Sequence, residues 1–356
     1  MTEIDDIDDC TNSDDTEIGF RNLEMTERIL THIDVKYSES FITLVRVILV
    51  ILLRVGFVLI QIGSIPTSNV NLILSQNIID LCWVSIVFIF LGSVFAYTGD
   101  LGSTMGKFYW IGHKDVNKEE VIIGWQAVMI ASAIATTCIV GRVQNITSFT
   151  IGLILCGVLQ PFIIHWTWTV DGWLSYNYFR SRKVMFRDYG GSTIVHMVGG
   201  LTGFVGCLIL GRRLMKLRDL DRASISTGSV ATTFLGHLLI TLGLQSLMIS
   251  NNINETQELI TTRLPNIIIN NLISISSCTI VVTVIYFYIH KSLDHWMMMR
   301  CVQATTAGIV IISAGVDDYS PPIAFLFGCI GGVLFYLVSR EVNYCVEHSA
   351  ALWARK

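Results

Sequence analysis

The feature that most constrains this chain is a series of nine long apolar runs separated by short polar segments. Each run is long enough to cross a hydrocarbon core about 30 Å thick as an α-helix. The runs occupy residues 41–64, 78–98, 120–140, 147–168, 190–211, 226–250, 265–289, 297–316 and 320–339. The pattern predicts an all-α fold: a polytopic integral membrane helix bundle with about nine transmembrane helices.

The composition excludes several other classes of protein. The chain is 52% apolar and 15% charged, whereas soluble domains carry about 25% charged residues. A net charge of −4 and the lack of any basic face argue against a nucleic-acid partner. Nine cysteines, mostly inside apolar runs, form neither a disulfide framework nor a metal-binding spacing. We expect no cofactor and no metal, and we find no phosphate loop or nucleophile elbow that would indicate an enzyme.

Three regions are expected along the chain. Residues 1–40 are rich in Asp and Glu and predict an acidic disordered tail. A transmembrane domain follows over residues 41–340, and residues 341–356 form a polar C-terminal tail. The sequence thus predicts an integral membrane protein with no sizeable soluble domain.

The orientation in the membrane depends on weak signals. The short loops on the two sides carry equal numbers of Lys and Arg, so the positive-inside rule is uninformative here. The acidic tail and a glycosylation sequon at Asn254 favour an extracellular N-terminus in the plasma membrane, although a second sequon at Asn145 would then lie inside.

The fifth apolar run carries the most informative pattern. His196, Gly199, Gly200 and Gly203 are spaced so that they share one face of a helix. Small residues on one face let helices approach closely in lipid, so we expect this face to look into the bundle. His196 is then a candidate pore or proton-handling group. The alternative is a histidine that is hydrogen-bonded between helices.

Polar and aromatic residues gather at the ends of the fourth and fifth runs. Asp188 is placed to cap the fifth helix, and it could also add negative field at the outer mouth. Trp166, Trp168 and Trp173 are typical of an interfacial belt. Trp168 could instead offer its ring face to a small cation.

Several other polar residues have no evident role. Arg54 lies deep in the first run and must face protein or water, but the sequence does not identify its partner. His165 and His237 lie within apolar runs. The pair Asp317-Asp318 is expected to be solvated in a tight turn.

The segment around His196 resembles the ammonium transporter (Amt/Mep/Rh) family. Other segments are similar to that family's helices in the same order. They are residues 56–64 with Asn69-Val70, residues 77–80 with Gly92 and Ala96-Tyr97, Trp125-Gln126, residues 165–173, and residues 188–203 with Gly211-Arg212-Arg213. The resemblance covers roughly residues 41–340, and the ordered set is specific although each segment is weak.

The resemblance implies a homotrimer in a lipid bilayer, with one narrow hydrophobic pore in each subunit. It implies that ammonium is captured at an outer vestibule and that ammonia passes along a pore lined by two histidines. Trp168 matches the tryptophan that attracts the cation, and Asp188 matches the acidic residue that supports its binding. His196 matches the first pore histidine.

The sequence departs from the family at the vestibule. Two stacked phenylalanines form the gate in the family, and Met129 and Leu247 stand in their places. Both are bulky and apolar but cannot stack. A serine position falls on Asn251, which can still accept a hydrogen bond. The glutamate usual in the first helix is Gln61.

The largest departure is the C-terminal end. The family has eleven helices in which the first five and the next five form an inverted repeat, whereas here the runs divide into five and four. The missing tenth helix would carry the second pore histidine, and His348 lies in a sequence that does not match it. We therefore expect an incomplete inverted repeat of the ammonium transporter fold, from either a truncated fragment or a diverged member.

Three functions are compatible with these patterns. The first is an ammonium/ammonia transporter or channel. The second is a transport-inactive relative that acts as a sensor or subunit, which Met129, Leu247 and Asn251 favour. The third is a membrane enzyme or receptor, which would need an acidic or metal cluster that the sequence does not display.

Overall fold

The computed structural model describes residues 40–63, 70–110, 116–175, 177–179, 182–184, 186–210, 229–249, 257–291 and 295–353. The chain divides into two compact units, Met1–Val45 and Arg46–Lys356, and we call the second unit the body. The described part of the first unit is the beginning of the helix Ser40–Gly63. The expected acidic tail, apart from Ser40, and the candidate residue Asn251 lie outside the described residues.

Eight helical segments of the described chain are long and apolar enough to cross a membrane. They are Ser40–Gly63, Val70–Tyr97, Lys118–Ile139, Asn145–Trp168, Ser192–Leu210, Val230–Met248, Arg263–Ile289 and Pro321–Val342. The remaining apolar run forms a shorter apolar helix, Met297–Ile312. The prediction of an all-α polytopic membrane fold is confirmed, with eight spans of full length rather than nine.

Three of these spans contain a π-helical segment. Val70–Tyr97 and Asn145–Trp168 each join two α-helices through one, and the span that begins at Ser192 opens with one. The segments are α2 (Val70–Val87), η2 (Phe88–Gly92) and α3 (Ser93–Tyr97); α5 (Asn145–Ile154), η3 (Leu155–Leu159) and α6 (Gln160–Trp168); and η4 (Ser192–Met197) and α7 (Val198–Leu210). Such segments are frequent at functional sites.

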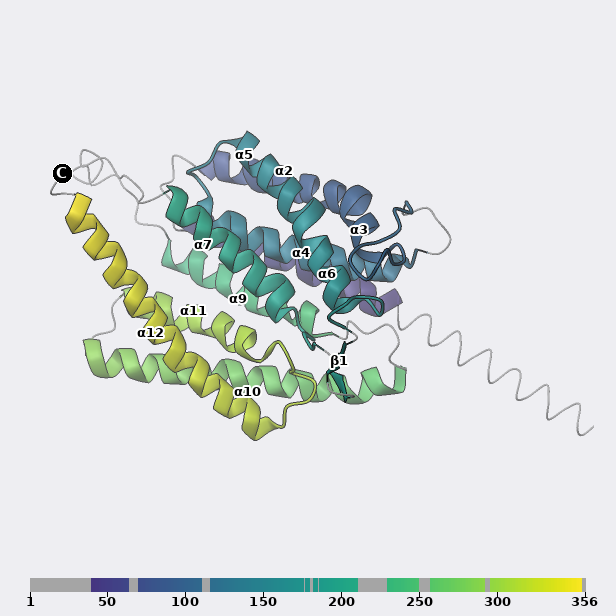
Figure 1. Ribbon diagram of the computed structural model, residues 1–356. Coiled ribbons are helices and arrows are strands. Elements are labelled where there is room, and N and C mark those ends of the chain that lie inside the picture. Colours follow the sequence, from purple (N-terminus) through teal and green to yellow (C-terminus); the bar gives the residue numbers. More distant parts are fainter. Residues whose placement is uncertain are drawn as a thin grey trace, which may run out of the picture. The chain divides into compact units, whose positions relative to one another are not determined.

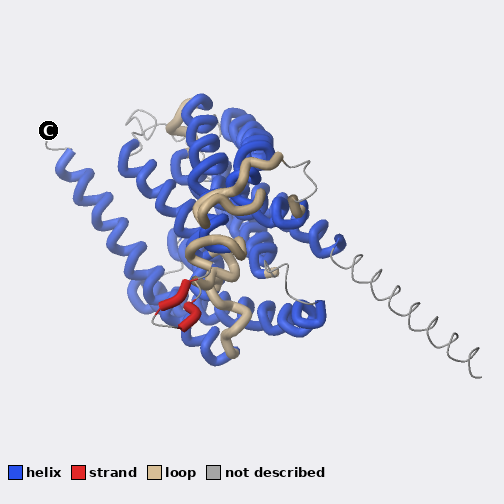
Figure 2. The backbone as a smooth tube through the Cα atoms, turned by 45° about the vertical axis from the view of Figure 1, so that its right-hand side comes forward, coloured by secondary structure: helices blue, strands red, loops and turns tan. Residues whose placement is uncertain are grey.

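The remaining elements are longer helices and one hairpin. The helices are α4 (Lys118–Ile139), α9 (Val230–Met248), α10 (Gln257–His290), α11 (His295–Ile312) and α12 (Pro321–Trp353). The short strands β1 (Asn177–Phe179) and β2 (Arg182–Val184) pair antiparallel, with Asn177 opposite Val184, and Figure 2 shows them in red.

The second span begins eight residues earlier than the sequence predicts, at Val70 instead of residue 78. The prediction was wrong because polar residues in this turn of α2 have partners inside the body. The Nε2 of Gln76 donates to Asn145 Oδ1 at 3.0 Å, and the Nδ2 of Asn77 donates to Gln61 Oε1 at 2.6 Å. Such pairing lets polar side chains lie within a span.

The C-terminal end also differs in its local structure. α12 continues to Trp353, so residues 341–353 of the expected polar tail are helical. The division of the chain into a transmembrane domain and tails remains a prediction.

The body contains two apolar cores. In the main core, residues 128–131 of α4 are all fully buried, so neighbouring segments enclose this helix on every side. A second core lies among α10, α11 and α12, where Cys278, Val282 and Ala304 are buried. Figure 1 shows α10 beside α11 and α12.

Two glycines of α7 allow it to lie close to α4. A Cβ atom on Gly199 would lie 2.8 Å from the Ala131 carbonyl oxygen, and one on Gly203 would lie 2.6 Å from Cys138 Sγ. Gly200 has nothing within 4 Å of the same position. The predicted three-glycine face is therefore wrong for Gly200, because each residue turns an α-helix by about 100° and Gly200 points away from α4.

The body has two ends, which we name by one residue each. The Trp168 face is the end of the body at which α6 ends with Trp168. At this face Gly190, just before η4, lies against Met248 at the end of α9. At the Gly63 face, Gly63 lies directly against Thr233 near the start of α9. The helix Ser40–Gly63 therefore ends at the face where α9 begins, and η4 begins at the face where α9 ends.

Candidate functional site

Asp188 caps the first turn of η4 at the Trp168 face. Its carboxylate accepts hydrogen bonds from the backbone N–H groups of Ser192 (2.5 Å), Thr193 (2.8 Å) and Ile194 (3.1 Å). A helix start leaves such N–H groups without partners in the helix, so a carboxylate here is stabilising. Burial raises the pKa of Asp188 above its usual value, and backbone hydrogen bonds from residues 191–194 oppose that rise.

Trp168 is fixed to the same residue by a different atom. Its indole Nε1 donates to the backbone carbonyl oxygen of Asp188 at 2.7 Å, and its ring packs against the main core. The other two tryptophans of the predicted belt contact the loop before α4 instead. Trp166 Nε1 donates to the carbonyl oxygen of Thr104 at 2.8 Å, and the backbone N–H of Trp173 donates to that of Ser103 at 3.3 Å.

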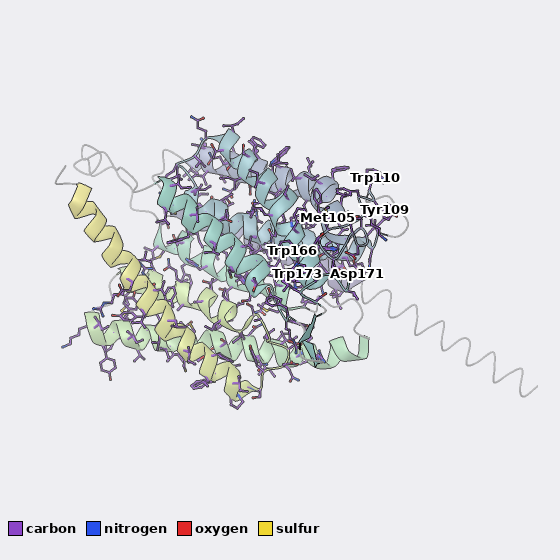
Figure 3. The ribbon with its side chains drawn as sticks, in the orientation of Figure 1. Met105, Tyr109, Trp110, Trp166, Asp171 and Trp173 are labelled. Carbon is purple, nitrogen blue, oxygen red and sulfur yellow. The ribbon has the colours of Figure 1, made fainter. Side chains whose placement is uncertain are left out.

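Figure 3 shows Trp166 and Trp173 at the end of the body where α3 and α6 end, together with Met105, Tyr109, Trp110 and Asp171. The rings of Trp166 and Trp173 meet edge to face, with centroids 5.9 Å apart. Trp110 and Trp173 are exposed. Exposed aromatic residues at a helix end are typical of a membrane–water interface, and Trp168 differs from them in facing Asp188.

His196 lies near the end of η4. The backbone N–H groups of Val195 and His196 both bond to the carbonyl oxygen of Gly191, which is where the π-helical turn forms. The Nε2 of His196 is buried and has no hydrogen-bond partner within the described part of the chain. An imidazole nitrogen in this condition remains available to a proton or a small ligand.

Gln160 of α6 contacts η4, and it is not among the residues predicted from the sequence. Its side chain is fully buried, and Nε2 donates to the carbonyl oxygens of Ala127 (3.2 Å) and Ile194 (3.0 Å). One amide therefore joins α6, α4 and η4. A glutamine in the middle of an apolar run is the signal that could have indicated it.

Met129 and Leu247 are both buried in the main core. Met129 Sδ lies 3.7 Å from Ser85 Oγ of α2. One helical turn away, Gln126 Nε2 donates to Ser246 Oγ at 3.2 Å, which joins α4 to α9 beside Leu247. Asn251, the remaining residue of the predicted set, falls outside the described ranges.

In the turn between α11 and α12, Asp318 is exposed as the sequence predicts, but the prediction of a solvated side chain is wrong for Asp317. Asp317 has a side chain that is 1% exposed and accepts hydrogen bonds from Arg187 and Arg263. Arg187 also donates to Asp318. Burial raises the pKa of Asp317, and the neighbouring charge of Arg187 opposes that rise.

The partner of Arg54 is Asp80. The guanidinium Nη2 donates to Asp80 Oδ2 at 2.6 Å, and Nη1 donates to the carbonyl oxygen of Met129 at 3.3 Å. Ser132 Oγ donates to the same Asp80 oxygen at 3.1 Å. The pair is buried between the helix Ser40–Gly63, α2 and α4, and no sequence pattern joins the two residues.

The other two intramembrane histidines differ from one another. His165 Nδ1 lies 2.8 Å from the Ala96 carbonyl oxygen and Nε2 lies 3.4 Å from Asp100 Oδ1, so it joins α6 to the end of α3. His237 on α9 is buried, and neither ring nitrogen has a hydrogen-bond partner among the residues that the structure describes.

Within the described part of the chain, this predominantly helical body contains eight helical segments long and apolar enough to cross a membrane, which defines a polytopic integral membrane protein. The chain belongs to the Ammonium Transporter Family, whose family model matches residues 41–348. Membership in the family that the motifs resemble is thereby confirmed.

Individual relatives are distant. The chain is 28% identical over 81% of its length to ammonium transporter 1 member 3 of Solanum lycopersicum, and 24% identical over 82% to ammonium transporter 3 of Dictyostelium discoideum. The matched parts are 65% and 66% of those two proteins, so the chain spans less than two thirds of the length of these curated relatives.

Solved structures have the same fold. A protein described as a sensor Amt protein superposes with a TM-score of 0.70 at 19% identity, over 83% of this chain and 73% of that chain. Saccharomyces cerevisiae Mep2 superposes with a TM-score of 0.65 at 17% identity, over 83% of this chain and 67% of that chain.

Proposed function

We propose that this chain carries ammonium nitrogen across a membrane, by capturing ammonium at the Trp168 face and passing ammonia along a path that His196 lines. One observation carries the proposal: Asp188 holds both Trp168 and the start of η4, and η4 carries a buried imidazole nitrogen without a partner. The names of the curated relatives, which are transporters, support the same substrate.

Capture is assigned to Asp188 and Trp168. An ionised carboxylate and an indole face both attract a small cation, and their effect is larger where water is partly excluded. The hydrogen bond from Trp168 Nε1 to the Asp188 carbonyl oxygen fixes the indole to the residue that carries the carboxylate. The two groups therefore act on one position at the mouth of the path.

Selection is assigned to the apolar interior. A bare ammonium ion loses its hydration at a large free-energy cost in an apolar medium, whereas neutral ammonia does not. The buried side chains of Met129 and Leu247 would form the apolar gate that enforces this difference. The Nε2 of His196, which has no partner among the described residues, is a ring nitrogen that can accept a proton, so we assign His196 to receive the proton that ammonium releases.

The proposal also covers Asn251, the oligomeric state and the orientation in the membrane. We assign Asn251 to the vestibule as a hydrogen-bond acceptor for the cation. We also propose that the protein forms homotrimers in the plasma membrane with its N-terminus outside. The acidic N-terminal tail and the sequon at Asn254 support this orientation.

A second function is favoured by one observation. Met129 and Leu247 replace the two aromatic gate residues that the family resemblance implies, so ring stacking at the gate is lost. A relative with an altered gate could bind ammonium without conducting it and act as a sensor or subunit. It would then retain saturable ammonium binding through Asp188 and Trp168 while uptake remained at background.

Uptake by purified protein separates the two functions. Proteoliposomes containing the chain should accumulate radiolabelled methylammonium, and His196→Ala should lower the rate at least about tenfold, or ~1.4 kcal/mol in the barrier. Met197→Ala is the matched control, because Met197 is the next residue but its side chain is 56% exposed. Equal uptake by the His196→Ala protein would remove His196 from the path.

A further inference from the structure

The segment that carries Asp188 is bonded to the turn between α11 and α12. The backbone N–H of Tyr189 donates to the Ala314 carbonyl oxygen at 3.0 Å, and that of Gly190 donates to the Ser313 carbonyl oxygen at 2.7 Å. The first five spans and the later helices therefore meet at the residue next to the proposed capture site.

Arg187 adds a side-chain clamp at the same place. Its Nη1 donates to Asp318 Oδ2 and its Nη2 donates to Asp317 Oδ2, so one guanidinium bridges two consecutive carboxylates. The planar fork of arginine suits such a geometry, and hydrogen bonds between two charged groups are stronger than neutral ones. The Asp317 side chain is 1% exposed whereas that of Arg187 is 49% exposed, so the buried carboxylate is the fixed end of the clamp.

The turn between α11 and α12 is held by residues of α10. Arg263 Nη1 lies 3.5 Å from Asp317 Oδ2. Asn270 Nδ2 donates to the carbonyl oxygens of Val316 (3.0 Å) and Tyr319 (2.7 Å). Because α10 holds the turn at several points, a group that is bonded to the turn takes its position from α10.

We propose that Arg187 is a positioning residue, which holds Asp188 and the start of η4 at a fixed place by bridging Asp317 and Asp318. The inference rests on the proposed function, because it assigns the clamp to the capture of ammonium. Release of Arg187 should let residues 188–194 move, and the Asp188 carboxylate and the Trp168 ring would no longer act on one position.

An electrostatic role for Arg187 makes the opposite prediction. A positive charge next to Asp188 repels a cation, so a residue that acted through its charge alone would weaken capture. Its removal would then strengthen capture, most of all at low ionic strength where screening is small. The sign of the change in affinity therefore distinguishes the two roles.

The test compares four full-length proteins in detergent and in proteoliposomes: the native chain, Arg187→Gln, Arg187→Lys, and Arg340→Gln. Arg340 is an exposed arginine in the second half of α12 and controls for loss of one positive charge. Hydrogen exchange is measured on peptides that cover residues 189–197, and the concentration for half-maximal methylammonium uptake is measured at low and high salt.

We expect Arg187→Gln to speed exchange in these peptides at least about tenfold, because local opening becomes easier. We also expect it to raise the half-maximal concentration at least about threefold. Arg187→Lys keeps the positive charge but has no planar fork to bridge two carboxylates, so it should change both values less than Arg187→Gln does. Arg340→Gln should change neither. Unchanged exchange in Arg187→Gln, or tighter capture at low salt, would overturn the inference. If the native chain shows no uptake, the proposed function fails, and the exchange result alone decides whether Arg187 positions the segment.

Discussion

At the scale of single residues, Asp188 uses its side-chain and backbone oxygens for different purposes. The carboxylate caps η4, and the backbone carbonyl oxygen accepts the indole N–H of Trp168. The cap could be predicted from sequence because it joins residues within one turn of each other. The bond to Trp168 could not, because it joins residues 20 positions apart through a loop whose path the sequence does not specify.

We predict that ammonium capture depends on the protonation of Asp188. Burial raises the pKa of this carboxyl above its usual value of 3.8. The ionised form attracts the cation, so its contribution is present above the raised pKa and is lost as the pH falls through it. Asp188→Asn should weaken capture about tenfold at neutral pH, or ~1.4 kcal/mol, and abolish this pH dependence. The check is the half-maximal methylammonium concentration as a function of pH.

The raised pKa of Asp188 also makes the free energy of unfolding depend on pH, in the direction opposite to that of capture. The folded protein binds this proton more readily than the unfolded chain does. The free energy of unfolding therefore rises as the pH falls from the raised pKa of Asp188 towards 3.8. An affinity profile of Asp188→Asn that follows that of the native chain would show that Asp188 is a structural cap without a role in capture.

At the scale of helices, the apolar runs predicted which segments cross the membrane but not how polar residues pair between them. Arg54 and Asp80 are 26 residues apart and lie on neighbouring antiparallel helices, so their contact depends on how those helices rotate and stagger. The π-helical turns are a second feature that the apolar runs did not predict. The extra residue in the π-helical turn of η4 changes which side chains face α4. The spacing placed His196 and Gly200 on one face, and this face was wrong for Gly200.

The Arg54–Asp80 pair gives a prediction for stability. Arg54→Met leaves the Asp80 carboxylate buried without its positive partner, which should lower the free energy of unfolding by about 3–5 kcal/mol. The double variant Arg54→Met/Asp80→Leu removes both charges and should be much closer to the native chain. Thermal unfolding in detergent measures both proteins. A double variant no more stable than the single one would show that the pair is not the cause.

The contact between α7 and α4 gives a second prediction. Gly199→Ala places a Cβ atom 2.8 Å from a backbone oxygen, and should destabilise the fold by about 1–3 kcal/mol. Gly200→Ala is the matched control, because it meets no atom within 4 Å. It should leave stability unchanged or raise it by about 0.5–1 kcal/mol through helix propensity. Equal unfolding temperatures for the two variants would contradict the close approach of these helices.

At the scale of the whole molecule, the chain is a helical membrane bundle of the Ammonium Transporter Family. Hydropathy, glycine spacing and the ordered motifs predicted both the helical membrane fold and the family, because these features are repeated along most of the chain. The burial of Asp317 was not predicted, because a pair of aspartates in a turn has no local signal for the arginines that cover it.

The most direct test of the account is growth on low ammonium by yeast that lacks its own ammonium carriers and expresses this 356-residue chain. Delivery to the cell surface is measured in parallel, and His196→Ala at equal surface level is the comparison. The account predicts growth with the native chain and little or none with His196→Ala. Failure of the native chain to support growth despite surface delivery, or equal growth of the two strains, would contradict it.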